Sequence, residues 1–182
     1  MCMAFDDGAT VSDGSPRENL SWPGFGQAMR ELATQVHRSG WMPDMIVAVA
    51  RGGLLPAGAV SYALGVKAMG TMNVEFYTGV SETLAEPVLL PPLMDVSELD
   101  GKRVLVVDDV ADSGKTLKMI MDLISARGLS LDGKSTARVD ARSMVIYSKP
   151  RSIIVPDYTW KETDLWINFP WSVLPPVTAQ ES

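Results

Sequence analysis

The stretch Val104 to Thr116, VLVVDDVADSGKT, decides the fold, because an apolar strand ending at Val107 leads through adjacent acids into a small-residue loop and a helix. An uninterrupted apolar run is typical of a strand that is buried on both faces of a parallel sheet. The following helix, expected to begin near Thr116 and to end at Gly128, has one apolar face. Its apolar residues are Leu117, Ile120, Met121 and Ile124. This unit predicts an α/β domain.

A second unit of the same kind lies upstream. The apolar run MIVAVA, residues 45–50, is followed by the turn RGG and by LLPAGAVSYALG, which is long enough for a covering helix. Before this run, apolar residues from Trp22 to His37 recur at helical spacing, and Gly40 marks the stop. A further strand is expected at Met144 to Tyr147. Apolar strands that feed helices predict a mostly parallel sheet with helices on both faces.

The chain of 182 residues, 46% hydrophobic and 21% charged, has the length and composition of one globular domain. Residues 1–17 are rich in Gly, Ser and Asp, so we expect a mobile N-terminal extension before a single domain over residues 18–177. The segment at about 77–102 contains three prolines and has no strong periodicity, and we interpret this long loop as an active-site lid.

Composition also limits the partners and the compartment. Acidic residues outnumber basic ones by 22 to 16, and the net charge of -6 opposes the attraction that most nucleic-acid binders use. The single cysteine, Cys2, cannot form an internal disulfide, and His37 lacks the neighbours that a zinc site needs. Without a signal-peptide leader or a membrane-length apolar run, we expect a cytoplasmic protein that binds neither nucleic acid nor membrane.

The loop after the strand that ends at Val107 combines two kinds of ligand group. Ser113, Gly114 and Thr116 can present backbone amides and hydroxyls at a positive helix terminus, which suits a phosphate dianion. Asp108 and Asp109 repel phosphate, but carboxylates can accept hydrogen bonds from ribose hydroxyls and can hold a divalent ion. An acid pair beside an anion site therefore indicates a sugar phosphate as the ligand.

At these residues the chain resembles the type I phosphoribosyltransferase family. Its residues 108–116, DDVADSGKT, match the signature of that family at every position. The resemblance implies a mostly parallel twisted sheet flanked by helices, with a small C-terminal hood at about 148–177. It further implies that Asp108 and Asp109 bind Mg²⁺ and the ribose of 5-phosphoribosyl-1-pyrophosphate (PRPP), and that Asp112 lies near the base as the catalytic acid or base. The residues implied to wrap the 5-phosphate are Asp112, Ser113, Gly114, Lys115 and Thr116.

Two other interpretations of the motif are weaker. Asp112 or Ser113 could simply cap the helix, but capping leaves the preceding acid pair unexplained. Gly114, Lys115 and Thr116 also spell the end of a nucleotide-triphosphate P-loop. That motif requires a glycine five positions before Gly114, where this chain has Asp109.

Two further sites follow from the family resemblance. Arg51 and Gly52, in the turn after the upstream strand, match a turn that similar enzymes use to bind pyrophosphate, often with a cis peptide. Lys149, Trp166 and Ile167 match the base site of bacterial xanthine-guanine and hypoxanthine-guanine phosphoribosyltransferases, across residues 20–177. The implied activity is transfer of phosphoribose from PRPP to a 6-oxopurine in purine salvage, by a homodimer or homotetramer.

Alternatives stay open at this point. Guanine, xanthine and hypoxanthine are not distinguished, and a transferase for another base or a PRPP-binding transcriptional regulator of the same fold would share the signature. The chain also departs from the similar enzymes in carrying Asn168 and Ser172 where they have acids. Between Ala68 and Gly101 it has no Lys or Arg, so a cationic lid contact with pyrophosphate is not expected.

Overall fold

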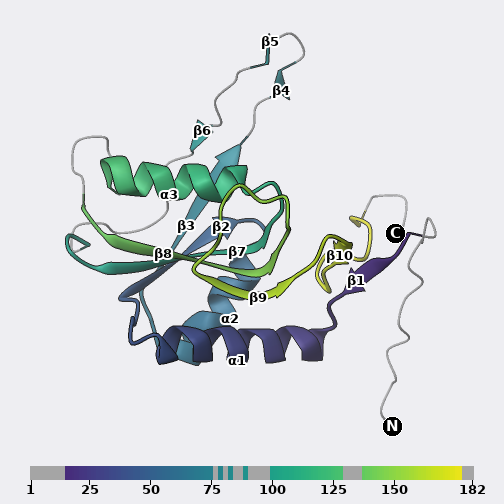
Figure 1. Ribbon diagram of the computed structural model, residues 1–182, viewed down its shortest axis with the longest axis horizontal. Helices are drawn as coiled ribbons and strands as arrows, with labels where there is room; N and C mark the ends of the chain where they lie inside the picture. The colour runs from purple at the N-terminus through teal and green to yellow at the C-terminus, as the bar shows by residue number, and fades with distance from the viewer. Residues whose placement is uncertain are drawn as a thin grey trace.

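The computed structural model describes residues 15–75, 78–79, 82–83, 88–89, 99–128 and 137–177. Its centre is a sheet of six strands in the order β6-β3-β2-β7-β8-β9 (Figure 1). The strands from β3 to β9 in this order are parallel, and β6 joins the edge in the antiparallel sense. The strands are β2 (Met45–Ala50), β3 (Met69–Glu75), β6 (Val88–Leu89), β7 (Arg103–Ala111), β8 (Asp140–Ser148) and β9 (Tyr158–Glu162). The predicted α/β fold with a mostly parallel sheet is confirmed.

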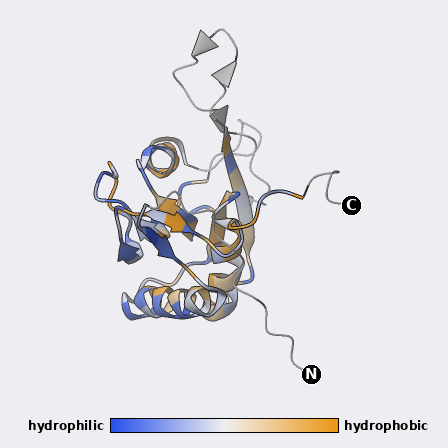
Figure 2. Cartoon of the chain, turned by 90° about the vertical axis from the view of Figure 1, so that its right-hand side faces the viewer, coloured by the Kyte–Doolittle hydropathy of each residue, from blue (hydrophilic) through white to orange (hydrophobic). Residues whose placement is uncertain are grey.

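Three helices cover this sheet, α1 (Trp22–Arg38), α2 (Leu54–Leu64) and α3 (Lys115–Arg127). The first two pack on one face and α3 packs on the other, so that each face of the sheet has its own buried apolar cluster. Figure 2 accordingly shows the strongest hydrophobic colour in the strands between the helices. The helices predicted from Trp22 and from near Thr116 are confirmed within a residue at each start.

The chain order of the parallel strands reverses between β2 and β7, because β3 lies on one side of β2 and β7 on the other. In open α/β sheets, ligands bind beyond the carboxyl ends of the strands at such a switch point. The pairing of β2 with β7 ends at Ala48 and Val107, whereas β7 stays paired with β8 as far as Ala111. The strand predicted to end at Val107 therefore runs further, and its final residues extend beyond its pairing with β2.

The C-terminal segment forms a separate ribbon, in which β10 (Trp166–Asn168) pairs in parallel with β1 (Arg17–Asn19). Aromatic rings join this ribbon to the rest of the domain: Trp171 stacks on Phe169 at 4.9 Å between centroids and meets Phe25 of α1 at 5.4 Å. The predicted hood thus includes an N-terminal strand that the sequence did not reveal. Of the predicted extension, residues 1–14 lie outside the described residues, and Arg17 belongs to β1.

The predicted lid at 77–102 lies mostly outside the described residues. Within it, β4 (Thr78–Gly79) and β5 (Glu82–Thr83) form a short antiparallel pair. Among the described residues, none of the helices has the length and apolar character needed to cross a membrane.

Candidate active site

The acid pair lies on β7, just past the point where this strand leaves β2. The backbone N–H of Asp109 donates to Asp108 Oδ1 at 2.9 Å, which ties the two residues together. Burial and the neighbouring Asp109 carboxylate raise the pKa of Asp108 well above its usual value, and burial also raises the pKa of Asp109. Two half-buried carboxylates that repel each other favour a bound cation.

The pair has the donor chemistry that magnesium prefers, since Mg²⁺ binds one or two carboxylates and completes its shell with water and substrate phosphates. Within the described part of the chain there is no cluster of three or more His, Cys, Asp or Glu side chains that could hold a metal. Asp108 and Asp109 therefore fit an ion that is shared with a phosphorylated substrate, rather than one enclosed by protein ligands.

Burial of the Asp108 carboxylate next to Asp109 is unfavourable in the ligand-free protein, so we predict that Asp108→Asn stabilises it. The folded-state pKa of Asp108 lies above its ordinary value of 3.8, so stability falls as pH rises from 3.8 through the raised pKa, and the cost is complete above it. Asparagine keeps the oxygen that accepts from Asp109 N–H but carries no charge. Thermal melts at pH 8 should show a midpoint higher by a few degrees.

The matched control for this prediction is Asp122→Asn, because Asp122 is an exposed carboxylate on α3 that pairs only with Lys118 in the described structure. Its melting midpoint should stay near that of the wild type. An Asp108→Asn protein that melts at or below the wild-type temperature would contradict an unfavourable interaction between the Asp108 and Asp109 carboxylates.

The turn after β2 approaches the acid pair closely. Gly52 has no room for a side chain, because an added Cβ would lie 2.3 Å from Asp109 Oδ2. The Ala50–Arg51 peptide is cis, as the family resemblance implied for this turn. Arg51, Gly52 and Asp109 line a cavity of about 840 Å³ together with residues 171, 172 and 174–176 of the C-terminal segment. The structure thus brings the predicted pyrophosphate residues against one of the predicted metal ligands.

The predicted phosphate loop runs from Asp112 to the first turn of α3. Gly114 caps α3 with a φ of +72°, a conformation that favours glycine, and an added Cβ there would lie 2.3 Å from Ser152 Oγ. Ile153 N–H donates to Ser113 O at 3.0 Å, which fixes the loop against the segment after β8. Lys115 and Thr116 begin the helix, so their amide groups lie among those without intrahelical partners. Helix starts of this kind are places where proteins bind anions.

The predicted base residues come together in a neighbouring cavity of about 550 Å³, a volume suited to a small organic ligand. Lys149 is buried and its amino group donates to the carbonyl of Leu165. Trp166 is 69% exposed at this cavity, so its ring does not belong to the core. Ile167 and Asp112 line the same cavity, while Ser172 lines both this cavity and the one beside Arg51.

Asn168 has a structural contact that accounts for one departure from the similar enzymes. Its side-chain amide donates to Asn19 Oδ1 at 2.8 Å, and its own Oδ1 accepts from Arg17 at 3.4 Å. These contacts join β10 to β1, the strand that supports the base residues from outside. The sequence did not indicate this role, because Asn19 and Asn168 are far apart along the chain.

Arg151 also lies beside the predicted site residues, and the sequence prediction missed it. Its guanidinium donates through Nε and Nη2 to Asp112 Oδ1, with an Nε to Oδ1 distance of 3.0 Å. It lines the base cavity together with Asp112 and Lys149. The only signal in the sequence was its place two residues after Lys149, which alone does not distinguish it from a solvated side chain.

At the switch point, the structure brings together an acid pair, a helix start and an adjoining cavity, in the place where open α/β sheets bind their ligands. Comparison with known proteins gives the family: the chain belongs to the phosphoribosyl transferase family, whose domain matches residues 18–176.

Individual relatives agree with this assignment. Xanthine-guanine phosphoribosyltransferase of Gluconobacter oxydans is 31% identical over 158 residues, which cover 86% of this chain and 84% of that protein. The purine phosphoribosyltransferase structure from Pyrococcus horikoshii is 34% identical, with a TM-score of 0.69 over 89% of this chain and 97% of that one. The Helicobacter pylori xanthine-guanine-hypoxanthine phosphoribosyltransferase shares the fold at 23% identity, with a TM-score of 0.68 over 87% and 95% of the two chains.

Proposed function

We propose that this phosphoribosyltransferase transfers the 5-phosphoribosyl group from PRPP to a 6-oxopurine, namely guanine, xanthine or hypoxanthine, and releases pyrophosphate in purine salvage. The observation that carries the proposal is the cavity in which Lys149, Trp166 and Ile167 meet Asp112, next to the phosphate loop. The purine enzymes named among the relatives support the same base class.

The donor would bind across both cavities. Its 5-phosphate would lie at the amides and hydroxyls of residues 112–116, where the helix dipole favours an anion. Asp108 and Asp109 would accept hydrogen bonds from the ribose hydroxyls. Arg51 and the backbone of Gly52 would hold the pyrophosphate in the larger cavity. A magnesium ion held by the acid pair would neutralise pyrophosphate charge and so favour its departure.

The base site can read a purine through three contacts. Lys149 donates to Leu165 O, but an ammonium group has three hydrogens, so it can also donate to the oxygen at purine position 6. The exposed ring of Trp166 offers a face for stacking. The backbone of Ile167 would meet the exocyclic edge of the ring. Together these contacts select a planar ring with an acceptor at position 6.

In the reaction, a purine ring nitrogen forms the bond to the anomeric carbon as the bond from that carbon to the pyrophosphate oxygen breaks. Positive charge develops on the ribose during this exchange, and the carboxylates of Asp108 and Asp109 favour it. The ring nitrogen loses its proton to Asp112, which lines the cavity that would hold the base. Products are the nucleoside monophosphate and pyrophosphate.

The direct test is to incubate the protein with magnesium, PRPP and one base at a time, and to measure the nucleotide and pyrophosphate formed. We expect turnover with at least one 6-oxopurine and at least 100-fold lower kcat/KM with adenine or uracil, since these lack an oxygen at purine position 6. Turnover confined to adenine or a pyrimidine would overturn the base assignment. Retention of RNA or DNA on a filter without any turnover would favour the regulator.

A further inference from the structure

Arg151 and Asp112 form an ion pair at the cavity of the predicted base residues. Both guanidinium donors, Nε and Nη2, go to the same carboxylate oxygen, Oδ1. Within the described chain no other hydrogen bond reaches the Asp112 side chain, so Oδ2 is left for a ligand. The two side chains are 70% and 52% exposed, and exposed ion pairs of this kind contribute little to folding stability. Stability alone therefore does not account for the pair.

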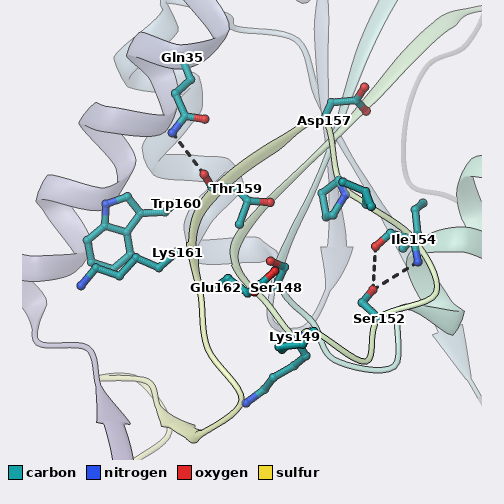
Figure 3. A pocket seen from close by; sticks show the side chains of 13 residues that line it. Gln35, Ser148, Lys149, Ser152, Ile154, Asp157, Thr159, Trp160, Lys161 and Glu162 are labelled. Carbon is teal, nitrogen blue, oxygen red and sulfur yellow. Dashed lines mark hydrogen bonds between the residues drawn. The ribbon is translucent and has the colours of Figure 1, made fainter.

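The position of Arg151 is set by the backbone around it. Ser152 N–H donates to Lys149 O at 3.0 Å, and Ser152 Oγ donates to Ile154 O at 2.8 Å, as Figure 3 shows for the second contact. The bond from Ile153 N–H to Ser113 O then joins this turn to the phosphate loop, one residue from Asp112. The turn is thus closed on itself and anchored to the loop.

Lys149, Ser152 and Ile154 also line a third hollow, of about 500 Å³. In Figure 3, Lys149 extends its amino group away from Ser152. Lys149 lines both this hollow and the cavity of the predicted base residues, whereas Arg151 lines only the second of the two. The guanidinium of Arg151 therefore lies at the base cavity on a turn that hydrogen bonds hold in place.

We propose that Arg151 is a positioning residue for the transfer reaction: it holds Asp112 by Oδ1 so that Oδ2 faces the purine ring nitrogen. This inference rests on the proposed function, in which Asp112 takes the proton from that nitrogen. The side chain of an exposed carboxylate otherwise populates several rotamers. An ion pair that holds one rotamer lowers the entropy lost in reaching the reactive geometry.

The test is a double-mutant cycle of Arg151→Met and Asp112→Asn, with kcat and the Kd for PRPP measured for every variant. We expect Arg151→Met to lower kcat about 10- to 100-fold while the Kd for PRPP stays within about threefold, because only the orientation of the proton acceptor is lost. In the Asp112→Asn background the same change should lower kcat less than about twofold, since the group that Arg151 positions is already absent. Arg151→Lys should recover part of the loss.

The matched control is Lys118→Met, which breaks an ion pair of similar exposure on α3, away from both cavities, and should leave kcat unchanged. Wild-type kcat in Arg151→Met, or a loss that is equally large in both backgrounds, would overturn the positioning role while the transferase assignment stands. If Arg151→Met melts early, Arg151→Gln replaces it in the cycle. Absence of turnover in the wild-type protein with every base would overturn the proposed function, and this inference with it.

Discussion

Asp112→Asn is expected to lower kcat about 100- to 10,000-fold, the range in which removal of a positioned acid or base reduces a rate. Asparagine has nearly the same shape and leaves the loop backbone intact, but it cannot take the proton of the purine nitrogen. In the proposed function, PRPP is held by the amides of the phosphate loop and by Asp108 and Asp109, so the Kd for PRPP should change less than about threefold. Turnover with the best base and calorimetric titration of PRPP measure the two quantities.

The control for this variant is again Asp122→Asn, which removes an exposed carboxylate from the same segment of the chain without touching either cavity. It should keep wild-type kcat. If Asp112→Asn turned over at the wild-type rate, Asp112 would have no proton to transfer, and its contact with Arg151 would be a surface ion pair without catalytic consequence.

The parts of the site that could be predicted are local in sequence. The acid pair, the phosphate loop and the start of α3 lie in one continuous stretch, so the order of residue types alone indicated strand, loop and helix. The same holds for Arg51 and Gly52, which directly follow an apolar strand. The carboxyl ends of parallel strands lie at one edge of the sheet, and in the structure Gly52 is so close to Asp109 that an added Cβ would overlap its carboxylate.

The parts that could not be predicted depend on contacts between distant segments. No periodicity in the first twenty residues indicates that β1 pairs with β10, since three residues are too few to show alternation. The extent of β7 was also missed, because acids usually end an apolar strand, whereas here β8 continues to pair with them. The orientation of Arg151 toward Asp112 depends on a turn whose bonds involve backbone atoms, which residue types do not specify.

The site also shows where binding has been favoured over stability. Burial raises the pKa of both adjacent carboxylates, which is unfavourable in the ligand-free protein but suits a cation and a developing positive charge. The tight fit of Gly52 against Asp109 serves the same end, because it leaves the backbone close to the acids. A variant that removes one of the two charges, such as Asp108→Asn, should therefore gain stability and lose activity.

Gly53→Ala is expected to cause the largest loss of stability among the single changes considered, about 3 kcal/mol in the free energy of unfolding. An added Cβ would lie 2.2 Å from Val107 O and 2.7 Å from Val49 O, which are backbone atoms of the two central strands. A flexible side chain could rotate away, but these carbonyls are held in the sheet. Since φ of Gly53 is −71°, the effect would come from this overlap and not from a strained dihedral.

Urea titration followed by circular dichroism measures this effect, and Gly58→Ala in the same helix is its control. Nothing lies within 4 Å of a Cβ added at Gly58, so alanine there should raise the free energy of unfolding by about 0.5–1 kcal/mol through its higher helix propensity. Both variants add one methyl group, at positions five residues apart. If the free energy of unfolding falls in one and rises in the other, the loss is due to the close approach of Gly53 to β2 and β7. Equal unfolding free energies for Gly53→Ala and the wild type would mean that α2 can move off the strands. The turn holding Arg51 would then lack the rigid support that the proposed pyrophosphate site requires.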